Sequence, residues 1–245
     1  RQGRHVVHLE IGEPDFDTPA HICEAAIEAL RAGHTHYAPS AGIPALREAV
    51  AETVRATRGI AVGPENVVIT PGAKPIIVFS LLACVGEGDE VIYPDTGFPI
   101  YRSVIDFIGA KPVPILLREE NDFRIDLDEF AALLTDRTRL VILNSPHNPT
   151  GGVLTSEDLV AIAGMVRDRD LYVLSDEVYA QILYEGEHHS IASLPGMAEK
   201  TIILDGHSKA YAMTGWRLGY GVAPREMVPH LVRLCTNYHS FTTVF

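Results

Sequence analysis

Short apolar runs recur along the chain and alternate with longer stretches of helical periodicity. Leu46, Val50 and Val54 fall on one face of a helix that the sequence predicts over residues 43–58, with Gly59 at its end. The runs that we interpret as strands are almost wholly apolar: NVVIT (66–70), EVIYP (90–94), PVPILL (112–117), RLVILN (139–144), LYVLSDE (171–177), TIILD (201–205) and WRLGYGV (216–222). Strands of this composition are buried on both faces, which is typical of parallel sheets covered by helices.

Helix signals between these runs complete an alternating order of strands and helices. The stretch TSED predicts a capping box in which Thr155 and Asp158 satisfy each other's end of the first turn. Another helix is expected after the cap residue Thr18 and Pro19, with Gly33 as its end. Further helices are expected from about residue 74, after Phe98, near 127–134 and over 156–168. We therefore predict an α/β fold, with a mainly parallel sheet and helices on both of its faces.

The pattern predicts one large domain over residues 16–245. Residues 1–15 open within a strand-like stretch, HVVHLEIG, and we interpret them as a segment of a smaller domain. The chain stops at SFTTVF without a closing helix. We therefore expect it to be part of a longer protein, with the small domain largely absent from these residues.

Composition and charge narrow the class of protein. The 245 residues are 47% hydrophobic, enough for a large core, and carry a formal net charge of −12. This charge argues against a nucleic acid or an anionic membrane as the main partner. The longest apolar stretch, PIIVFSLLACVG, is too short to span a bilayer. Three widely separated cysteines, Cys23, Cys84 and Cys235, suggest reduced thiols and a cytoplasmic location rather than a disulfide framework.

Eleven histidines raise the question of a metal site. The two clusters, HTH at 34–36 and HH at 188–189, lack the cysteine or carboxylate spacing of a zinc site. We predict no metal site and interpret these histidines as surface or turn residues.

Polar side chains follow four of the predicted strands at the point where each strand ends. VVIT is followed by PGAK, RLVILN by SPHNPTGG, LYVLS by Asp176, Glu177 and Tyr179, and TIILD by GHSK. Each of these has an ordinary structural explanation when it is taken alone: a tight turn, a cap or a solvated lysine. Because ligands of open α/β sheets bind beyond the carboxyl ends of the strands, we expect the four groups to share one crevice.

The residue types in this crevice suit the chemistry of pyridoxal phosphate. Lys209, one of only four lysines, follows a buried strand, and desolvation there frees its amine to form a Schiff base with an aldehyde. The Asp176 carboxylate would keep a pyridine nitrogen protonated, so that the ring accepts electrons from a carbanion. Tyr179 and Asn148 can hydrogen-bond the phenolic oxygen of the ring.

The phosphate of the same cofactor has candidate ligands in two segments. Gly72, Ala73 and Lys74 lie in a small-residue turn at a predicted helix N-terminus, where backbone N–H groups attract anions. Arg217 adds a planar, permanently charged fork that suits phosphate oxygens.

These stretches resemble the class I/II pyridoxal-phosphate-dependent aminotransferases, the aspartate aminotransferase family of fold type I. The resemblance covers essentially the whole chain, and its motifs are specific in combination and in order. They are IGEPDFDTP, HYAPSAGIPALREAV, NSPHNPTGG, SDEVYAQILYEG and GHSKAYAMTGWRLGYG. The resemblance implies that Lys209, Asp176 and Tyr179 are catalytic, with Lys209 carrying the cofactor and moving the proton at Cα of the substrate.

Further roles come from the resemblance alone. Phe98 matches the aromatic residue that stacks on the cofactor ring. Tyr37 matches a tyrosine that reaches the phosphate of the neighbouring subunit's cofactor, which implies a homodimer with shared sites. Gly12 matches a segment that lines the substrate carboxylate, and Asn148 is expected to serve the substrate as well as the cofactor.

The chain departs from the family pattern in two places. Many members carry a phosphate-binding serine three positions before the lysine, where this chain has Gly206. Ser208, next to Lys209, is the candidate that would compensate as a cofactor ligand. The family's arginine for the substrate carboxylate lies in the C-terminal small domain, and no stretch of this chain resembles that domain.

The resemblance implies an aminotransferase that moves an amino group between an L-amino acid, with aspartate as the default, and a 2-oxo acid such as 2-oxoglutarate. Two alternatives keep the cofactor, a C–S β-lyase and a cyclopropane-forming synthase, because all of these reactions begin with removal of the Cα proton. A third alternative is the aminotransferase-like sensor domain of a transcription regulator. The acidic charge and the absence of a basic helix pair disfavour that alternative.

Overall fold

The computed structural model describes residue 7 and residues 11–245. The strand expected at HVVHLEIG and most of the segment 1–15 fall on residues 1–6 and 8–10, outside the described residues.

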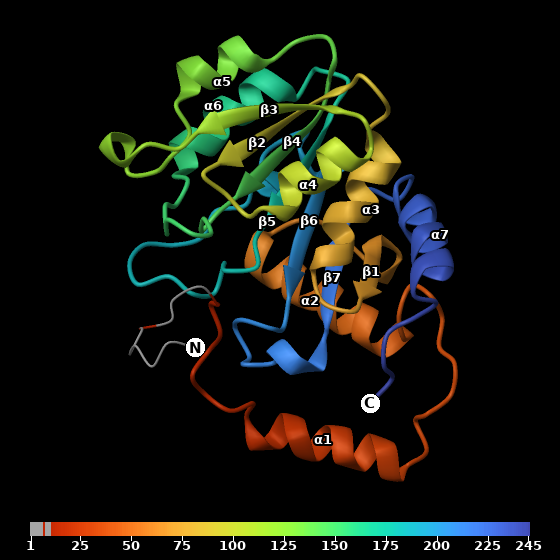
Figure 1. Ribbon diagram of the computed structural model, residues 1–245. Coiled ribbons are helices and arrows are strands. Elements are labelled where there is room, and N and C mark those ends of the chain that lie inside the picture. The colour runs from red at the N-terminus through yellow and green to blue at the C-terminus, as the bar shows by residue number, and fades with distance from the viewer. Residues whose placement is uncertain (1–6, 8–10) are drawn as a thin grey trace, which may run out of the picture.

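The described residues form one sheet with the strand order β1-β7-β6-β5-β4-β2-β3 (Figure 1). The strands are β1 (Val67–Thr70), β2 (Glu90–Asp95), β3 (Lys111–Leu116), β4 (Thr138–Asn144), β5 (Tyr172–Asp176), β6 (Thr201–Gly206) and β7 (Gly219–Val222). Neighbours pair in parallel from β6 through β3, whereas β7 is antiparallel to both β1 and β6. The predicted α/β fold with a mainly parallel sheet is confirmed, and β7 is its antiparallel exception.

Helices cover both faces of the sheet. The helices of the described residues are α1 (Ala20–Arg31), α2 (Pro44–Arg58), α3 (Lys74–Cys84), α4 (Ile100–Phe107), α5 (Leu127–Leu133), α6 (Ser156–Val166) and α7 (Val228–Tyr238). Helices α3, α4 and α7 bury their apolar sides against one face, in a cluster that includes Leu174, Ile202 and Leu204. Helices α5 and α6 cover the other face near β2–β5, and α2 covers it near β1, β6 and β7 (Figure 1).

Local signals placed two helix ends correctly. The amide of Asp158 donates to Thr155 Oγ1 at 3.2 Å, and the Thr155 amide donates to Asp158 Oδ2 at 2.9 Å, so the predicted capping box is confirmed. Helix α2 ends at Gly59, whose φ of 65° is the left-handed conformation that favours glycine.

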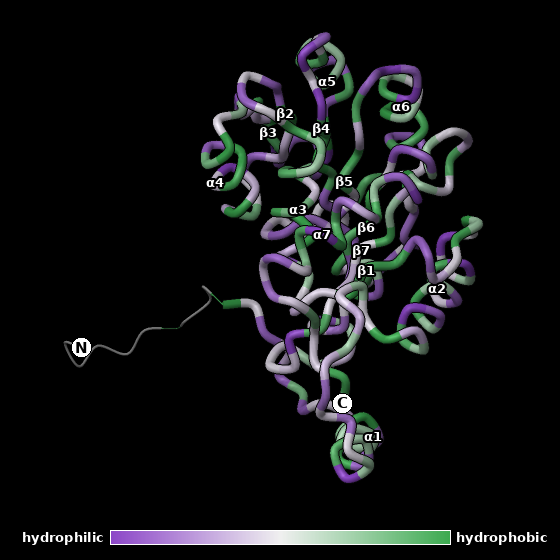
Figure 2. Tube along the Cα trace, turned by 90° about the vertical axis from the view of Figure 1, so that its right-hand side faces the viewer, coloured by the Kyte–Doolittle hydropathy of each residue, from purple (hydrophilic) through white to green (hydrophobic). Residues whose placement is uncertain are grey.

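Helix α1 differs from the expectation at its start. It begins after Pro19, and Thr18 does not cap it. The Thr18 hydroxyl instead donates to the Ala212 carbonyl at 2.5 Å and accepts from Trp216 Nε1 at 3.0 Å. These tertiary partners outcompete the local cap. Helix α1 has no buried residue and stands away from the sheet in Figures 1 and 2.

None of the helices in the described part of the chain combines the length and the apolar character that a membrane span requires.

Candidate active site

A cavity of about 740 Å³ lies at the carboxyl ends of β4, β5 and β6 and beside the N-terminus of α3. Most of the residues singled out in the sequence line it together. They are Gly12, Ala73, Lys74, Phe98, Asn148, Asp176, Tyr179, Ser208, Lys209 and Arg217. Their convergence follows from the topology, because parallel strands bring their carboxyl ends to one edge of the sheet.

Two of the selected residues lie outside the lining of this cavity. Gly72 lies directly behind it, packed under the guanidinium of Arg217. Tyr37 is 93% exposed, and its ring packs edge-on against Phe241 with a centroid separation of 5.3 Å. Tyr37 therefore lies apart from the lining of this cavity.

Asp176, the last residue of β5, is buried at the floor of the cavity. Its Oδ2 accepts a 2.6 Å hydrogen bond from the Tyr101 hydroxyl, and its Oδ1 accepts a long bond of 3.4 Å from the Val178 amide. Burial raises the pKa of Asp176 to about 6, although the bond from Tyr101 opposes that shift. The carboxylate is thus an anion with neutral donors only, in a place where a cationic ligand would be stabilised.

Lys209 approaches the cavity from the loop that follows β6. Its Nζ donates to the Gly12 carbonyl at 2.5 Å and lies 5.9 Å from the centroid of the Tyr179 ring. Burial lowers the pKa of Lys209, opposed by Glu13, while the charges of Arg217 and Lys74 lower it further. A neutral amine, the nucleophilic form, is therefore more accessible here than on an ordinary surface lysine.

The loop that carries Asn148 is held by a second amide. Asn144 ends β4, and its Oδ1 accepts from the Asn148 amide at 2.9 Å while its Nδ2 donates to the Asp176 carbonyl at 3.1 Å. Asn144 therefore couples the end of β5 to the loop and fixes Asn148 beside Tyr179 at the cavity wall.

Arg217 and the turn before α3 form the opposite wall. Arg217 adopts the left-handed conformation, with φ 53° and ψ 55°, and its Nη1 donates to the Thr214 carbonyl at 2.8 Å. A side chain at Gly72 would collide with this guanidinium. Lys74 opens α3, and its Nζ lies 5.2 Å from the centroid of the Phe98 ring. Two cationic groups and a helix N-terminus thus share one end of the cavity.

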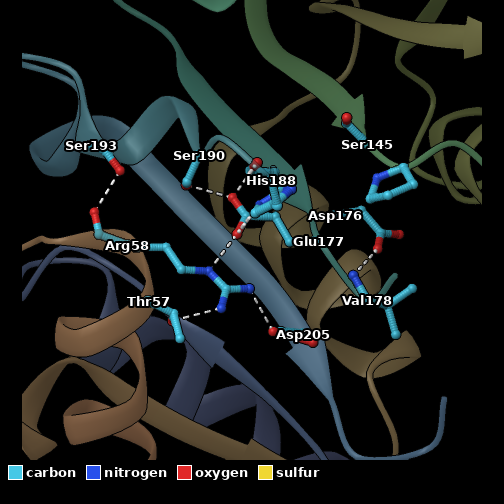
Figure 3. A network of polar contacts seen from close by, with 12 residues as sticks. Thr57, Arg58, Ser145, Asp176, Glu177, Val178, His188, Ser190, Ser193 and Asp205 are labelled. Carbon is cyan, nitrogen blue, oxygen red and sulfur yellow. Dashed lines mark hydrogen bonds and ion pairs between the residues drawn. The ribbon is translucent and has the colours of Figure 1, made fainter. Parts of the chain in front are cut away.

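A buried polar network lies behind Asp176, on the other face of the sheet (Figure 3). The Arg58 guanidinium donates to Glu177 Oε2 at 3.0 Å and to Asp205 Oδ2 at 2.8 Å. His188 Nε2 lies 3.1 Å from Glu177 Oε2, and Ser190 donates to Oε1 of the same carboxylate. The network joins the end of α2 to the ends of β5 and β6, the two strands that lead into Asp176 and Lys209.

The two carboxylates of this network, Glu177 and Asp205, are compensated by neighbouring positive charge to different extents. Burial raises the pKa of Glu177, but His188 and Arg58 outweigh it, and the net shift is downward. Burial raises the pKa of Asp205 to about 6, although the charge of Arg58 opposes that shift. Both carboxylates act on Asp176 as like charges, in the direction that raises its pKa.

Tyr101 and Arg58 are among the residues of this region that the sequence patterns did not reveal. Tyr101 follows Phe98 by three positions, the spacing of one helical face, and that was the available signal for Tyr101. Arg58 ends a helix far from Glu177 and Asp205 in the sequence, so no local pattern could pair it with them.

A larger hollow of about 1030 Å³ lies between α1, residues 13–18 and residues 241–245. Its lining is mostly apolar, with Phe16, Leu30, Trp216 and Phe241 among its side chains. The convergent titratable groups belong to the smaller cavity, which is therefore the candidate active site. Within the described residues no group of three or more histidine, cysteine or acidic side chains could hold a metal ion.

Comparison with known proteins gives a consistent set of relatives. Residues 4–245 match the family described as aminotransferase class I and II. The chain is 46% identical over 241 residues to an arginine–pyruvate transaminase of Pseudomonas aeruginosa, and 45% identical over 232 residues to an aspartate aminotransferase of Pyrococcus abyssi. Among solved structures, an aromatic aminotransferase from Pyrococcus horikoshii superposes with a TM-score of 0.93 at 44% identity.

These matches cover nearly all of this chain and part of each relative. The two relatives align with 98% and 94% of the chain, but with 61% and 60% of their own lengths. The solved structure aligns with 96% of the chain and 63% of its own. The chain therefore spans about three fifths of the curated relatives that it matches.

Proposed function

Because the chain belongs to the aminotransferase class I and II family, we propose that the complete protein transfers an amino group between an L-amino acid and a 2-oxo acid, with pyridoxal phosphate as cofactor. The observation that carries this proposal is the convergence of Lys209, Asp176 and Tyr179 on one cavity at the strand ends. Lys209 contributes a partly desolvated amine, and Asp176 a buried anion.

The chain's own residues fit this cofactor at both of its ends. Asp176 is a buried carboxylate with neutral hydrogen-bond donors, and a protonated ring nitrogen is the cationic partner that it lacks. At the other end, Arg217, Lys74 and the N-terminus of α3 form a cationic cradle for a dianionic phosphate. Gly72 and Ala73 would contribute backbone to this cradle, and Ser208 a hydroxyl.

When it is bound, pyridoxal phosphate supplies a ring that accepts the electron pair left on Cα of the substrate. Asp176 would hold the ring nitrogen protonated, which strengthens that electron sink. Lys209 would remove the Cα proton of the substrate and return it. Tyr179 and Asn148 would hydrogen-bond the ring oxygen, and Phe98 would stack on the ring face.

We propose the class of substrate, an L-amino acid with a 2-oxo acid, and not one particular amino acid. The relatives are named for arginine, aspartate and aromatic amino acids at similar identities, so the names leave the amino acid open. Aspartate with 2-oxoglutarate is the pair that we propose to test first. Gly12 and Asn148 would border the substrate carboxylate; their place in the cavity lining, with the Gly12 carbonyl bound to Lys209, supports this role.

The organisation of the complete protein forms part of the same proposal. Residues 16–245 would be the cofactor-binding domain, and residues 1–15 would belong to a smaller domain that also carries the arginine for the substrate carboxylate. The exposure of Tyr37 supports a homodimer in which this tyrosine reaches the partner's cofactor. A cytoplasmic location stays a prediction from the three separated cysteines.

An amino-donor screen of the complete protein tests this proposal. The protein is loaded with pyridoxal phosphate and mixed with single L-amino acids and 2-oxoglutarate, and glutamate formation and cofactor absorbance are followed. We expect glutamate from at least one donor, and none from a Lys209→Ala variant. Release of pyruvate or of a thiol without glutamate would contradict transfer and favour the lyase alternative.

A further inference from the structure

Gly219, the first residue of β7, lies in a row with the ends of two neighbouring strands. It pairs with Thr70 at the end of β1 on one side and with Gly206 at the end of β6 on the other. After Thr70 the chain turns through residues 71–73 and enters α3. This turn passes directly over Gly219, so the turn and β7 are in contact through their backbones.

The contact leaves no room for a side chain. A Cβ atom at position 219 would lie 2.5 Å from the carbonyl carbon of Gly72, 2.8 Å from Cα of Ala73 and closer still to the Ala73 nitrogen. These are backbone atoms, which cannot rotate away. Ordinary contact begins near 3.4 Å, so a methyl group would push the turn outward by about 1 Å. The φ angle of Gly219 lies outside the left-handed region, so the close approach alone requires glycine.

The displaced turn is the one that faces Arg217. The Arg217 guanidinium packs against Gly72, and the Thr70 hydroxyl donates to the Gly72 carbonyl at 2.7 Å. Arg217 precedes Gly219 by two residues and is held from its own side by Thr214. A turn that moves away from β7 therefore changes its spacing to Arg217, while Lys209 and Asp176 stay on their own strand ends.

We propose that Gly219 is a positioning residue for the cofactor phosphate. Its missing side chain lets the 71–73 turn rest on β7, which sets the backbone N–H groups of Ala73 and Lys74 opposite the Arg217 guanidinium. This role deepens the proposed function and rests on it. β7 contributes no side chain to the cavity lining. In this role it nevertheless sets the distance between the two parts of the phosphate site, the 71–73 turn and Arg217.

Gly221 provides a matched control on the same strand. It lies two residues further along, so a Cβ there points to the same face of the sheet. Its nearest neighbours would be Ile76 side-chain atoms, at 2.8, 3.2 and 3.3 Å, and no atom of the 71–73 turn is among them. Its φ is also outside the left-handed region, so alanine brings no backbone strain at either position.

The test compares pyridoxal phosphate with pyridoxal, which lacks the phosphate. Both are titrated by absorbance into the complete cofactor-free protein and into its Gly219→Ala and Gly221→Ala variants. We expect Gly219→Ala to weaken pyridoxal phosphate about tenfold or more, the effect of losing one hydrogen bond to a charged group. Its affinity for pyridoxal should stay within about twofold, and Gly221→Ala should leave both affinities unchanged.

Each other outcome has a definite meaning. A Gly219→Ala variant that keeps the full preference for the phosphorylated ligand would overturn the role of Gly219 alone. Equal weakening of both ligands would also overturn it, because the residue would then shape the whole pocket. An unmodified protein without any preference for the phosphorylated ligand would overturn the proposed function itself.

A milder variant keeps the test decisive if Gly219→Ala does not fold. A Cβ at Gly206 would lie 3.1 Å from Cα of Gly219 and 3.3 Å from the Leu218 carbonyl oxygen, a milder disturbance of the strand on which the turn rests, and its 3.7 Å distance to Cβ of Ala73 is ordinary contact. We expect Gly206→Ala to weaken pyridoxal phosphate by a few-fold and to spare pyridoxal. A Gly206→Ala variant with unchanged affinity for both would contradict the proposal.

Discussion

The Tyr101 hydroxyl donates a 2.6 Å hydrogen bond to Oδ2 of Asp176, and both side chains are buried. Tyr101 comes from α4 and Asp176 from the end of β5, so the bond joins a helix to the strand end beneath it. The ring of Tyr101 also packs edge-on against Phe98, at 5.9 Å between centroids. One phenol thus orients both the proposed ring-nitrogen partner and the proposed stacking residue.

Replacing Tyr101 by phenylalanine should move the acid limb of the pH profile upward. The bond from Tyr101 lowers the pKa of Asp176, so its loss raises that pKa. Amino transfer needs ionised Asp176, so its rate should fall on acidification at a higher pH than in the unmodified protein. For a bond of ordinary strength the acid limb should move by about one pH unit. The measurement is the transfer rate against pH. Tyr93→Phe, at a buried tyrosine of β2, is the control, and an unmoved limb in Tyr101→Phe would refute the coupling.

Replacing Asp176 by asparagine should leave cofactor binding largely intact and reduce amino transfer by about 10²–10³-fold or more. The amide keeps the shape of the side chain but does not hold a proton on the ring nitrogen. Single-turnover rates of the loaded variant provide the measurement. Turnover close to that of the unmodified protein would remove Asp176 from the mechanism.

The same substitution should stabilise the cofactor-free protein at neutral pH. The pKa of Asp176 rises from 3.8 to about 6 on folding, so its contribution to stability is present below pH 4 and is lost as the pH rises through 6. At pH 8 the free energy of unfolding of the unmodified protein should be about 2–3 kcal/mol lower than that of the Asp176→Asn variant. Urea unfolding at pH 4 and pH 8 measures this. A difference that does not grow with pH would show that the carboxylate is not strained by burial.

Borohydride reduction of the loaded protein should fix the cofactor to Lys209. Two lysines line the cavity, Lys209 and Lys74, and the pKa of Lys209 is lowered by burial. Peptide mapping by mass spectrometry identifies the modified residue. Lys74→Ala should retain the adduct on Lys209, whereas an adduct on Lys74 in the unmodified protein would reverse the assignment.

Replacing Arg58 by methionine should cost about 3–5 kcal/mol of unfolding free energy, because it leaves the buried carboxylates of Glu177 and Asp205 without their cation. Arg124→Met is the comparison. Arg124 pairs with Asp158 at 3.0 Å but is partly exposed, and its loss should cost about 1 kcal/mol. Chemical denaturation measures the unfolding free energy of both variants. Similar losses would show that burial of the Arg58 network adds nothing to the stability of the fold.

The sequence was informative where structure depends on neighbours in the chain or on the direction of strands. The capping box of Thr155 and Asp158 is local, and so is the glycine end of α2. The cavity could be predicted because apolar, non-alternating strands indicate a parallel sheet, and a parallel sheet gathers its carboxyl ends. Asp176 is the last residue of one of these strands, and Asn148 and Lys209 come a few residues after the ends of two others.

Long-range partners could not be predicted in the same way. Tyr101 and Asp176 are 75 positions apart, and Arg58 and Asp205 are 147 apart. The Thr18 hydroxyl followed tertiary partners rather than its expected cap. The antiparallel setting of β7, and with it the contact of Gly219 with the 71–73 turn, depends on packing that a glycine in a strand-like sequence does not encode.

Helix α1 has consequences for hydrogen exchange. A twelve-residue helix is marginal on its own in water, and α1 buries none of its side chains in the described part of the chain. Its amide protons should therefore exchange with solvent faster than those of α3, which lies in the core. Any surface that comes to cover α1 should slow this exchange. The protection of α1 amides thus reports on assembly without a change in the catalytic cavity.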